Sequence, residues 1–335
     1  MATGRLAYLT MSVPVEETDL TSALAEVRAG AGGLLLFGSA APPGLGAELR
    51  RLEAAAPGHL GTLVMTDEEG GGVERMANLV GTLPWPRWMA SHWSAARIEA
   101  AVTAMGRRMH AAGVLMDLAP VVDVDGRNIP PGATDPDGWR SFSGDTSVVA
   151  RDGRAYMKGL LAAGELPVLK HFPGLGGASG NTDVMAAHTL PWPTLEKVAL
   201  APFEAGIAAG APAVMVSNAT VPGLSRYPAS LSPAVISREL RQRLHFKGLV
   251  LTDSLSAVAI SAAGFSVPAA AVQALRAGAD MVLFSLQATP AATRVLAGRI
   301  AAAIVAAVAD HTLGRASLVA AAAAVLRARH VSLCG

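Results

Sequence analysis

The stretch that decides the fold is LPVLKHFPGLGGASGNTD, residues 166–183. It begins with apolar residues that do not alternate with polar ones, and such a run is typical of a parallel strand covered on both faces. Lys170 and His171 follow the run directly, and a loop rich in glycine comes next. The stretch therefore predicts a buried strand whose end delivers a cation and an imidazole to a flexible loop.

Apolar runs of the same kind recur along the chain. They lie near residues 5, 32, 61, 113, 211, 247 and 279. Helix-like stretches separate them, and many of these end in glycine, the favoured residue just after a helix. Eight strand–helix units predict an α/β fold, a single-domain (β/α)8 TIM-type barrel over residues 1–335, with a loop over its mouth at 123–139. A doubly wound open sheet is the alternative, but no G-x-G-x-x-G fingerprint follows the first strand.

The composition limits the class of ligand. Apolar residues make up 51% of the chain, charged residues 16%, and the net charge is +1. No basic field exists to hold nucleic acid or an anionic membrane, so we expect a small-molecule ligand and neither of those partners. The N-terminus lacks the features of a signal peptide, and charges within 291–324 argue against a membrane span, which together predict a cytoplasmic protein. The oligomeric state is not indicated.

Cysteine and histidine usage gives no sign of a metal or a cofactor. The single cysteine, Cys334, excludes an intrachain disulfide and a zinc cluster built from thiolates. The eight histidines are scattered, and none forms an H-x-x-x-H or H-x-H pair. We therefore expect no metal and no cofactor.

Polar side chains stand at the ends of five predicted strands. In a barrel of this class, catalytic groups project from the carboxyl ends of the strands. The residues are Asp67, Glu68 and Glu69, then Asp117 and Asp123, then Lys170 and His171, then Ser217 and Asn218, then Asp253 and Ser254. Any one of them can be the solvated start of a loop, but their recurrence on five strands predicts a functional site.

Each of these residues also has a purely structural interpretation. Asp253 directly follows the run GLVLT and can act as the N-cap of the next helix, a role that aspartate fills well. Lys170 can extend its charged end into water along apolar surface, and His171 can be a satisfied core histidine. The residues alone leave these alternatives open.

Several longer stretches add a family resemblance. They are MTDEEGGGVERM (65–76), RSFSGD (140–145), VLKHFPGLG (168–176), PASLSPAVISRELRQRLHFKGLVLTDSLS (228–256) and AGADMVL (277–283). Together, in order and over almost the whole chain, they resemble glycoside hydrolase family 3 in its single-domain β-N-acetylglucosaminidase type. The resemblance implies a TIM-type barrel and hydrolysis of a terminal sugar with retention of configuration.

The resemblance also implies roles for individual residues. Asp253 matches the nucleophile, which attacks the anomeric carbon and forms a glycosyl-enzyme; an acid protonates the leaving oxygen and later activates water as a base. Sugar-binding positions fall on Asp67, Arg75, Arg140, Lys170, His171 and, where the family has a histidine, Asn218. Buried donors of this kind discriminate well, because a wrong ligand leaves them unpaired.

The chain departs from the family pattern at the proton-transfer group. The family carries a D-S-H triplet on the loop after strand five, and aligned without gaps this triplet falls on Asn181, Thr182 and Asp183. Other motif positions differ at Gly72, Leu175, Asn218 and Ser254.

Three interpretations follow from this departure. In the first, Asp183 is the acid/base, with a pKa raised by burial. In the second, the loop is longer than the match implies, and His188 takes the role while Asp183 orients it. In the third, glycosidase activity is lost, and the barrel binds a sugar-like or apolar small molecule or catalyses another reaction.

Overall fold

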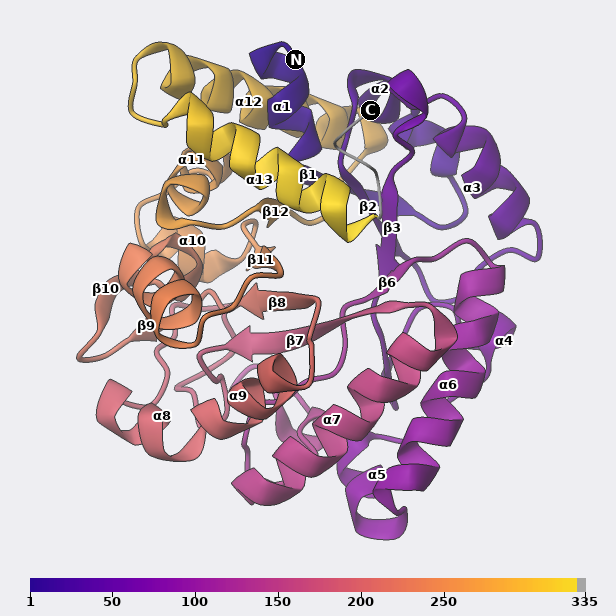
Figure 1. Cartoon of the computed structure of the whole chain (residues 1–335), viewed down its shortest axis with the longest axis vertical. Coiled ribbons are helices and arrows are strands. Elements are labelled where there is room, and N and C mark those ends of the chain that lie inside the picture. The colour runs from indigo at the N-terminus through magenta and orange to yellow at the C-terminus, as the bar shows by residue number, and fades with distance from the viewer. Residues whose placement is uncertain (330–335) are drawn as a thin grey trace.

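Eight parallel strands close into a barrel in the order β1-β12-β11-β8-β7-β6-β3-β2 (Figure 1). The structure is a computed structural model and describes residues 1–329. The barrel strands are β1 (Met11–Glu16), β2 (Gly33–Phe37), β3 (Leu63–Thr66), β6 (Met116–Asp117), β7 (Leu166–Phe172), β8 (Ala213–Val216), β11 (Leu249–Ser254) and β12 (Met281–Leu283). Pairing of Met11 with Val282 joins the first strand to the last. The predicted (β/α)8 barrel is confirmed, and the open sheet is not found.

Helices surround the barrel on its outer side (Figure 1). They are α1 (Thr3–Leu9), α2 (Leu24–Ala29), α3 (Leu45–Glu53), α4 (Ala77–Val80), α5 (Pro86–His92), α6 (Ala95–Ala111), α7 (Thr146–Ala163), α8 (Trp192–Val198), α9 (Leu200–Ala208), α10 (Val258–Ala262), α11 (Val267–Ala277), α12 (Pro290–Ala309) and α13 (Arg315–Ala328). A π-helical segment, Ala234–Arg243, lies between β8 and β11. The chain also forms two small antiparallel hairpins, β4 (Glu68–Gly70) with β5 (Val73–Glu74) and β9 (Thr220–Val221) with β10 (Ser225–Pro228).

The first predicted strand began too early. Residues 3–9 form helix α1, and strand β1 starts only at Met11. Leu6 and Leu9 are buried on the inner side of α1, which packs against α12 and α13 (Figure 1). A short apolar run is buried in either conformation, so its hydrophobicity does not distinguish a helix from a strand.

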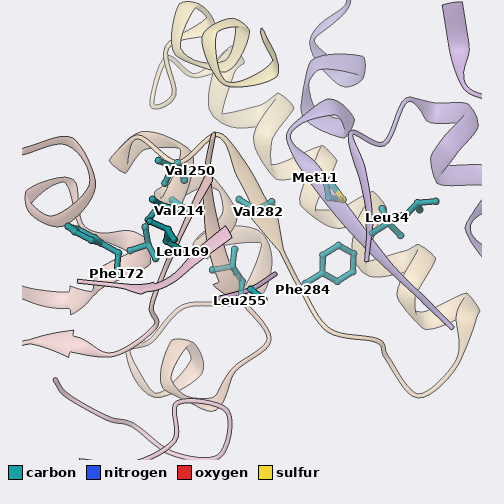
Figure 2. Packing of buried hydrophobic residues seen from close by; sticks show 14 of the residues in the cluster. Met11, Leu34, Leu169, Phe172, Val214, Val250, Leu255, Val282 and Phe284 are labelled. Carbon is teal, nitrogen blue, oxygen red and sulfur yellow. The ribbon is translucent and has the colours of Figure 1, made fainter. Parts of the chain in front are cut away.

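Both faces of each barrel strand are buried, which explains the continuous apolar runs. On β11, Leu249 and Leu251 point into the barrel and belong to its inner core. Val250, between them, packs in the outer core with Val214 of β8 and with Phe172 at the end of β7 (Figure 2). Residues that alternate between these two cores leave no polar face, as expected for a closed parallel barrel covered by helices.

Two loops lie at the mouth of the barrel, and the second of them, 123–139, was predicted there. The turn after β3 contains Gly71 with φ +66°, and a Cβ atom there would lie 2.0 Å from the ring of Trp85. Only glycine fits such a backbone, so the glycine run brings main chain close to the mouth. The segment 123–139 forms no regular element until the 3₁₀ turn Gly138–Arg140.

Helix α12 is the one helix in the described part of the chain that is long and apolar enough to cross a bilayer. A core helix passes the same test of length and composition, so the observation is weak evidence for a membrane span. The helix packs against α1 and α11, and the side chains of Ile300 and Ile304 are fully buried.

Candidate active site

A pocket of about 660 Å³ opens at the carboxyl ends of the barrel strands. Of the predicted site residues, it is lined by Asp67, Arg75, Arg140, Lys170, His171, Asp183 and Asp253. His188 and Asn218 are not among its lining residues. The fold therefore brings together side chains from β7, β11 and the loops after β3, β6 and β7.

Asp253 stands near the end of β11 and does not cap a helix. Its Oδ1 accepts a hydrogen bond of 2.7 Å from the backbone N–H of Ser254. The next helix, α10, begins after Ala257 and has no side-chain cap. The N-cap interpretation is therefore wrong, and the carboxyl of Asp253 faces the pocket.

Asn218 supports the end of this strand from outside the pocket. The residue is fully buried, and its Nδ2 donates a 2.7 Å hydrogen bond to the carbonyl of Ser254. Its Oδ1 accepts a 2.6 Å hydrogen bond from Ser230. The prediction that Asn218 contacts the ligand is corrected, because both ends of its amide are bonded to protein groups that hold β11 in place.

A buried ion network forms one wall of the pocket. Lys170 Nζ lies 2.9 Å from Asp67 Oδ1 and 2.5 Å from Glu69 Oε1. Arg140 binds Glu69 through two hydrogen bonds of 2.8 Å. The side chain of Lys170 is only 3% exposed, so its charged end does not reach bulk water. The alternative of a lysine that extends into solvent is therefore wrong.

This network favours the charged forms of Glu69 and Lys170. Burial by itself favours the neutral form of Glu69, but the charges of Arg140 and Lys170 hold the pKa of Glu69 well below its usual value. Burial also opposes the charge on Lys170, yet Asp67 and Glu69 raise the pKa of its amine. The sequence marked Glu69 only as the polar end of a strand. No spacing rule shows that two cations from distant segments meet at its carboxylate.

His171 is fixed by a second carboxylate. Its Nδ1 lies 2.7 Å from Asp123 Oδ2, and Asp123 also accepts the backbone N–H groups of His171 and Leu175. Three contacts thus converge on one carboxyl and fix the orientation of the imidazole ring. Asp123 thus holds the Nδ1 side of the imidazole ring, and His171 is one of the residues that line the pocket.

Asp183 lies on the loop after β7, which docks onto α10. The carbonyl of Asp183 accepts the N–H of Val258, and the carbonyl of Thr182 accepts the N–H of Ala259. Burial and then the negative charge of Asp253 raise the pKa of Asp183 to about 6. Neighbouring protein atoms crowd the carboxyl, although the residue as a whole is exposed to solvent. This is the pKa range in which a carboxyl can exchange protons near neutral pH.

The structure does not bring His188 to Asp253. Its backbone pairs with Thr220 of β9, and its N–H bonds the hydroxyl of Ser179. The imidazole Nδ1 lies 3.0 Å from the carbonyl of Thr189, and the residue is exposed away from the pocket lining. This placement contradicts the interpretation in which Asp183 orients His188.

Comparison with known proteins agrees with the fold. The family described as "Glycosyl hydrolase family 3 N terminal domain" matches residues 28–328. The beta-hexosaminidase LpqI of Mycobacterium tuberculosis is 38% identical over 242 residues, which are 69% of this chain and 60% of LpqI. The chain thus matches less than two thirds of that relative's length.

Solved structures extend the similarity over the whole barrel. The beta-N-acetylhexosaminidase of Beutenbergia cavernae has a TM-score of 0.88 at 32% identity, covering 99% of each chain. A glycosyl hydrolase of the GH3 family from Mycobacterium smegmatis has a TM-score of 0.84 at 34% identity, covering 98% of this chain and 97% of its own. A family match over most of the chain and a shared barrel lead to one conclusion: the chain belongs to glycosyl hydrolase family 3.

Proposed function

We propose that the protein is a retaining β-glycosidase that acts on terminal N-acetylhexosamine residues. Asp253 is the nucleophile, and Asp183 is the acid/base. The observation that carries the proposal is that both carboxyls line one pocket, where burial and then the negative charge of Asp253 raise the pKa of Asp183. The choice of sugar rests on relatives named beta-hexosaminidase and beta-N-acetylhexosaminidase.

The two carboxyls suit the two steps of retaining hydrolysis. In the first step Asp253 attacks the anomeric carbon, the bond to the leaving oxygen breaks, and Asp183 gives its proton to that oxygen. The glycosyl-enzyme then holds Asp253 as a neutral ester. Asp183, which has given up its proton, is now a carboxylate, and the loss of the negative charge on Asp253 lowers its pKa and favours this ionised form. It can then take a proton from the water that releases the sugar.

The ion network would hold the sugar ring in place. Lys170, Asp67 and Arg75 offer donors and acceptors on one wall, with Arg75 Nη2 3.9 Å from Asp67 Oδ2. These groups are positioned by each other before a ligand arrives, so little order is lost on binding. A ligand without matching hydroxyls leaves them desolvated and unpaired, which disfavours its binding.

The test is hydrolysis of a panel of aryl β-glycosides, with the anomer of the released sugar followed by proton NMR. We expect turnover of the N-acetylglucosaminide with retention, and its loss in the Asp253→Ala variant. No turnover of any glycoside, or equal turnover in both proteins, would reject the proposal and favour a barrel that only binds its ligand. Release of the inverted anomer would reject Asp253 as a nucleophile.

A further inference from the structure

Asp137 is a buried carboxylate without a partner. It lies at the end of the segment 123–139, directly before the turn Gly138–Arg140, and its relative exposure is 0%. Neither of its side-chain oxygens has a hydrogen-bond partner among the residues that the structure describes. A buried charge of this kind is costly unless a proton or a cation neutralises it. The role of Asp137 is not explained by the ion network of the pocket.

The surroundings of Asp137 are acidic. The negative charges of Asp123, Asp125 and Asp135 all act on its carboxyl. Arg140 is the nearby cation, but its guanidinium is already bound to both oxygens of Glu69 and to the carbonyl of Pro136. The positive charge of Arg140 acts on Asp137, but no hydrogen bond from the guanidinium reaches that carboxyl.

Two further buried groups face the same point. One ligand atom each from Asp123, Asp137 and His171 lies within 4.8 Å of the others. Ligand atoms that share one zinc ion at about 2 Å stand about 3–4 Å apart, so small side-chain shifts bring the three into a coordination shell. Two carboxylate oxygens and one imidazole nitrogen form a donor set typical of a divalent transition-metal ion.

We propose that Asp123, Asp137 and His171 form a binding site for a divalent transition-metal cation such as Zn²⁺. Nδ1 of His171, which donates to Asp123 at 2.7 Å, would give its proton to solvent and bind the ion. The two carboxylates balance the charge of the ion. The backbone N–H groups of His171 and Leu175 continue to orient Asp123.

The ion would have a structural role. All three side chains are buried, with His171 the most exposed at 5%. The ion joins the loop 123–139 to strand β7 and fixes the imidazole of His171 at the wall of the pocket. Such a site could not be recognised from the sequence, because its ligands come from three separate positions and not from a short histidine motif. The inference does not depend on the proposed glycosidase activity.

The test is zinc binding by the untagged full chain. The protein is stripped with EDTA, dialysed against a zinc buffer, and its metal content is measured by mass spectrometry. We expect one zinc per chain in the wild type and background levels in the Asp137→Asn variant. The control is the His110→Gln variant, which should keep the zinc. His110 lies beside one buried carboxylate only, with its Nδ1 3.2 Å from Glu165 Oε1. Absence of zinc in the wild type, or equal zinc in Asp137→Asn, would overturn the proposal.

A second measurement covers the case in which Asp137→Asn does not fold. Zinc-soaked crystals of the wild type should give an anomalous peak bounded by the three side chains. A peak only at other residues, or none, contradicts the site. An infrared carboxylic-acid band that persists in wild type equilibrated with zinc, and is lost in a folded Asp137→Asn variant, would show that a proton neutralises Asp137 instead.

Discussion

Asp183 and Asp253 line one pocket, and burial and then the negative charge of Asp253 raise the pKa of Asp183 to about 6. The two carboxyls come from different elements, the loop after β7 and the end of β11. Backbone hydrogen bonds from Val258 and Ala259 hold the loop on α10. The interaction therefore depends on the docking of this loop, and it links the protonation of one residue to the charge of the other.

The first prediction concerns this link. The Asp253→Asn variant removes the negative charge that raises the pKa of Asp183 and keeps the size of the side chain, so that pKa should fall. The measurement is a carbon NMR titration of the carboxyl resonances, with Asp183 assigned by its absence in Asp183→Asn. The exposed, distant Asp310→Asn serves as the control. An unchanged titration of Asp183 in Asp253→Asn would show that burial alone sets the pKa.

The second prediction concerns pH dependence. If Asp183 is the acid, it must be protonated in the free enzyme, so kcat/KM should fall by about tenfold per pH unit above the pKa of about 6. The measurement is the pH profile on an N-acetylglucosaminide with a poor leaving group, which needs protonation most. This limb should disappear in Asp183→Asn. A profile that keeps the limb in that variant assigns it to another group.

The third prediction separates Asp183 from His188. Loss of a general acid costs about 10²–10⁴-fold in rate, so Asp183→Asn should lower kcat/KM by that factor. His188→Ala should retain near wild-type activity, because its imidazole lies outside the pocket lining. Steady-state kinetics on the same substrate compare the two variants. A large loss of kcat/KM in His188→Ala, with near wild-type activity in Asp183→Asn, would instead support His188 as the acid/base.

The fourth prediction concerns the buried ion network. Lys170→Met leaves Asp67 and Glu69 without their shared cation, and breaking a buried pair in this way costs about 3–5 kcal/mol in the free energy of unfolding. Urea denaturation measures the loss. Lys197→Met, at an exposed position on α8, is the matched control and should change stability by less than about 0.5 kcal/mol. Equal stability of the two variants would contradict the network.

The fifth prediction concerns the support of β11. Asn218→Ala leaves the carbonyl of Ser254 and the hydroxyl of Ser230 unpaired, which should cost about 1–3 kcal/mol in the free energy of unfolding. Asn128→Ala, on the exposed loop, is the control, since its hydrogen bond to Trp139 is open to solvent. If Asn218→Ala weakens substrate binding and leaves stability unchanged, the residue contacts the ligand after all.

The sequence predicted the barrel well because burial on both faces leaves a clear pattern. The runs that end at Lys170 and Asp253 lack polar positions, and the structure places them on β7 and β11. Polar residues at the strand ends then meet at the mouth because parallel strands all end there. The prediction of a strand at the start of the chain was wrong, because residues 3–9 bury Leu6 and Leu9 equally well as a helix.

Contacts between distant segments could not be predicted in the same way. Glu69 meets Arg140 and Lys170 only once the barrel is closed. Asn218 ends a strand like the ligand-facing residues, yet its amide turns toward Ser254 and Ser230. A position at the end of a strand indicates that a residue is near the site. The direction of its side chain depends on packing against distant segments, which cannot be predicted from the sequence pattern.

The most direct test of the central claim is covalent trapping of the nucleophile. The protein is incubated with an N-acetylglucosaminyl fluoride that carries fluorine at C5, and the adduct is located by peptide mass spectrometry. The account predicts one sugar per chain, attached to Asp253, and none on the Asp253→Ala variant. A sugar attached to any other residue, or turnover of the substrate with no covalent intermediate on Asp253, would contradict it.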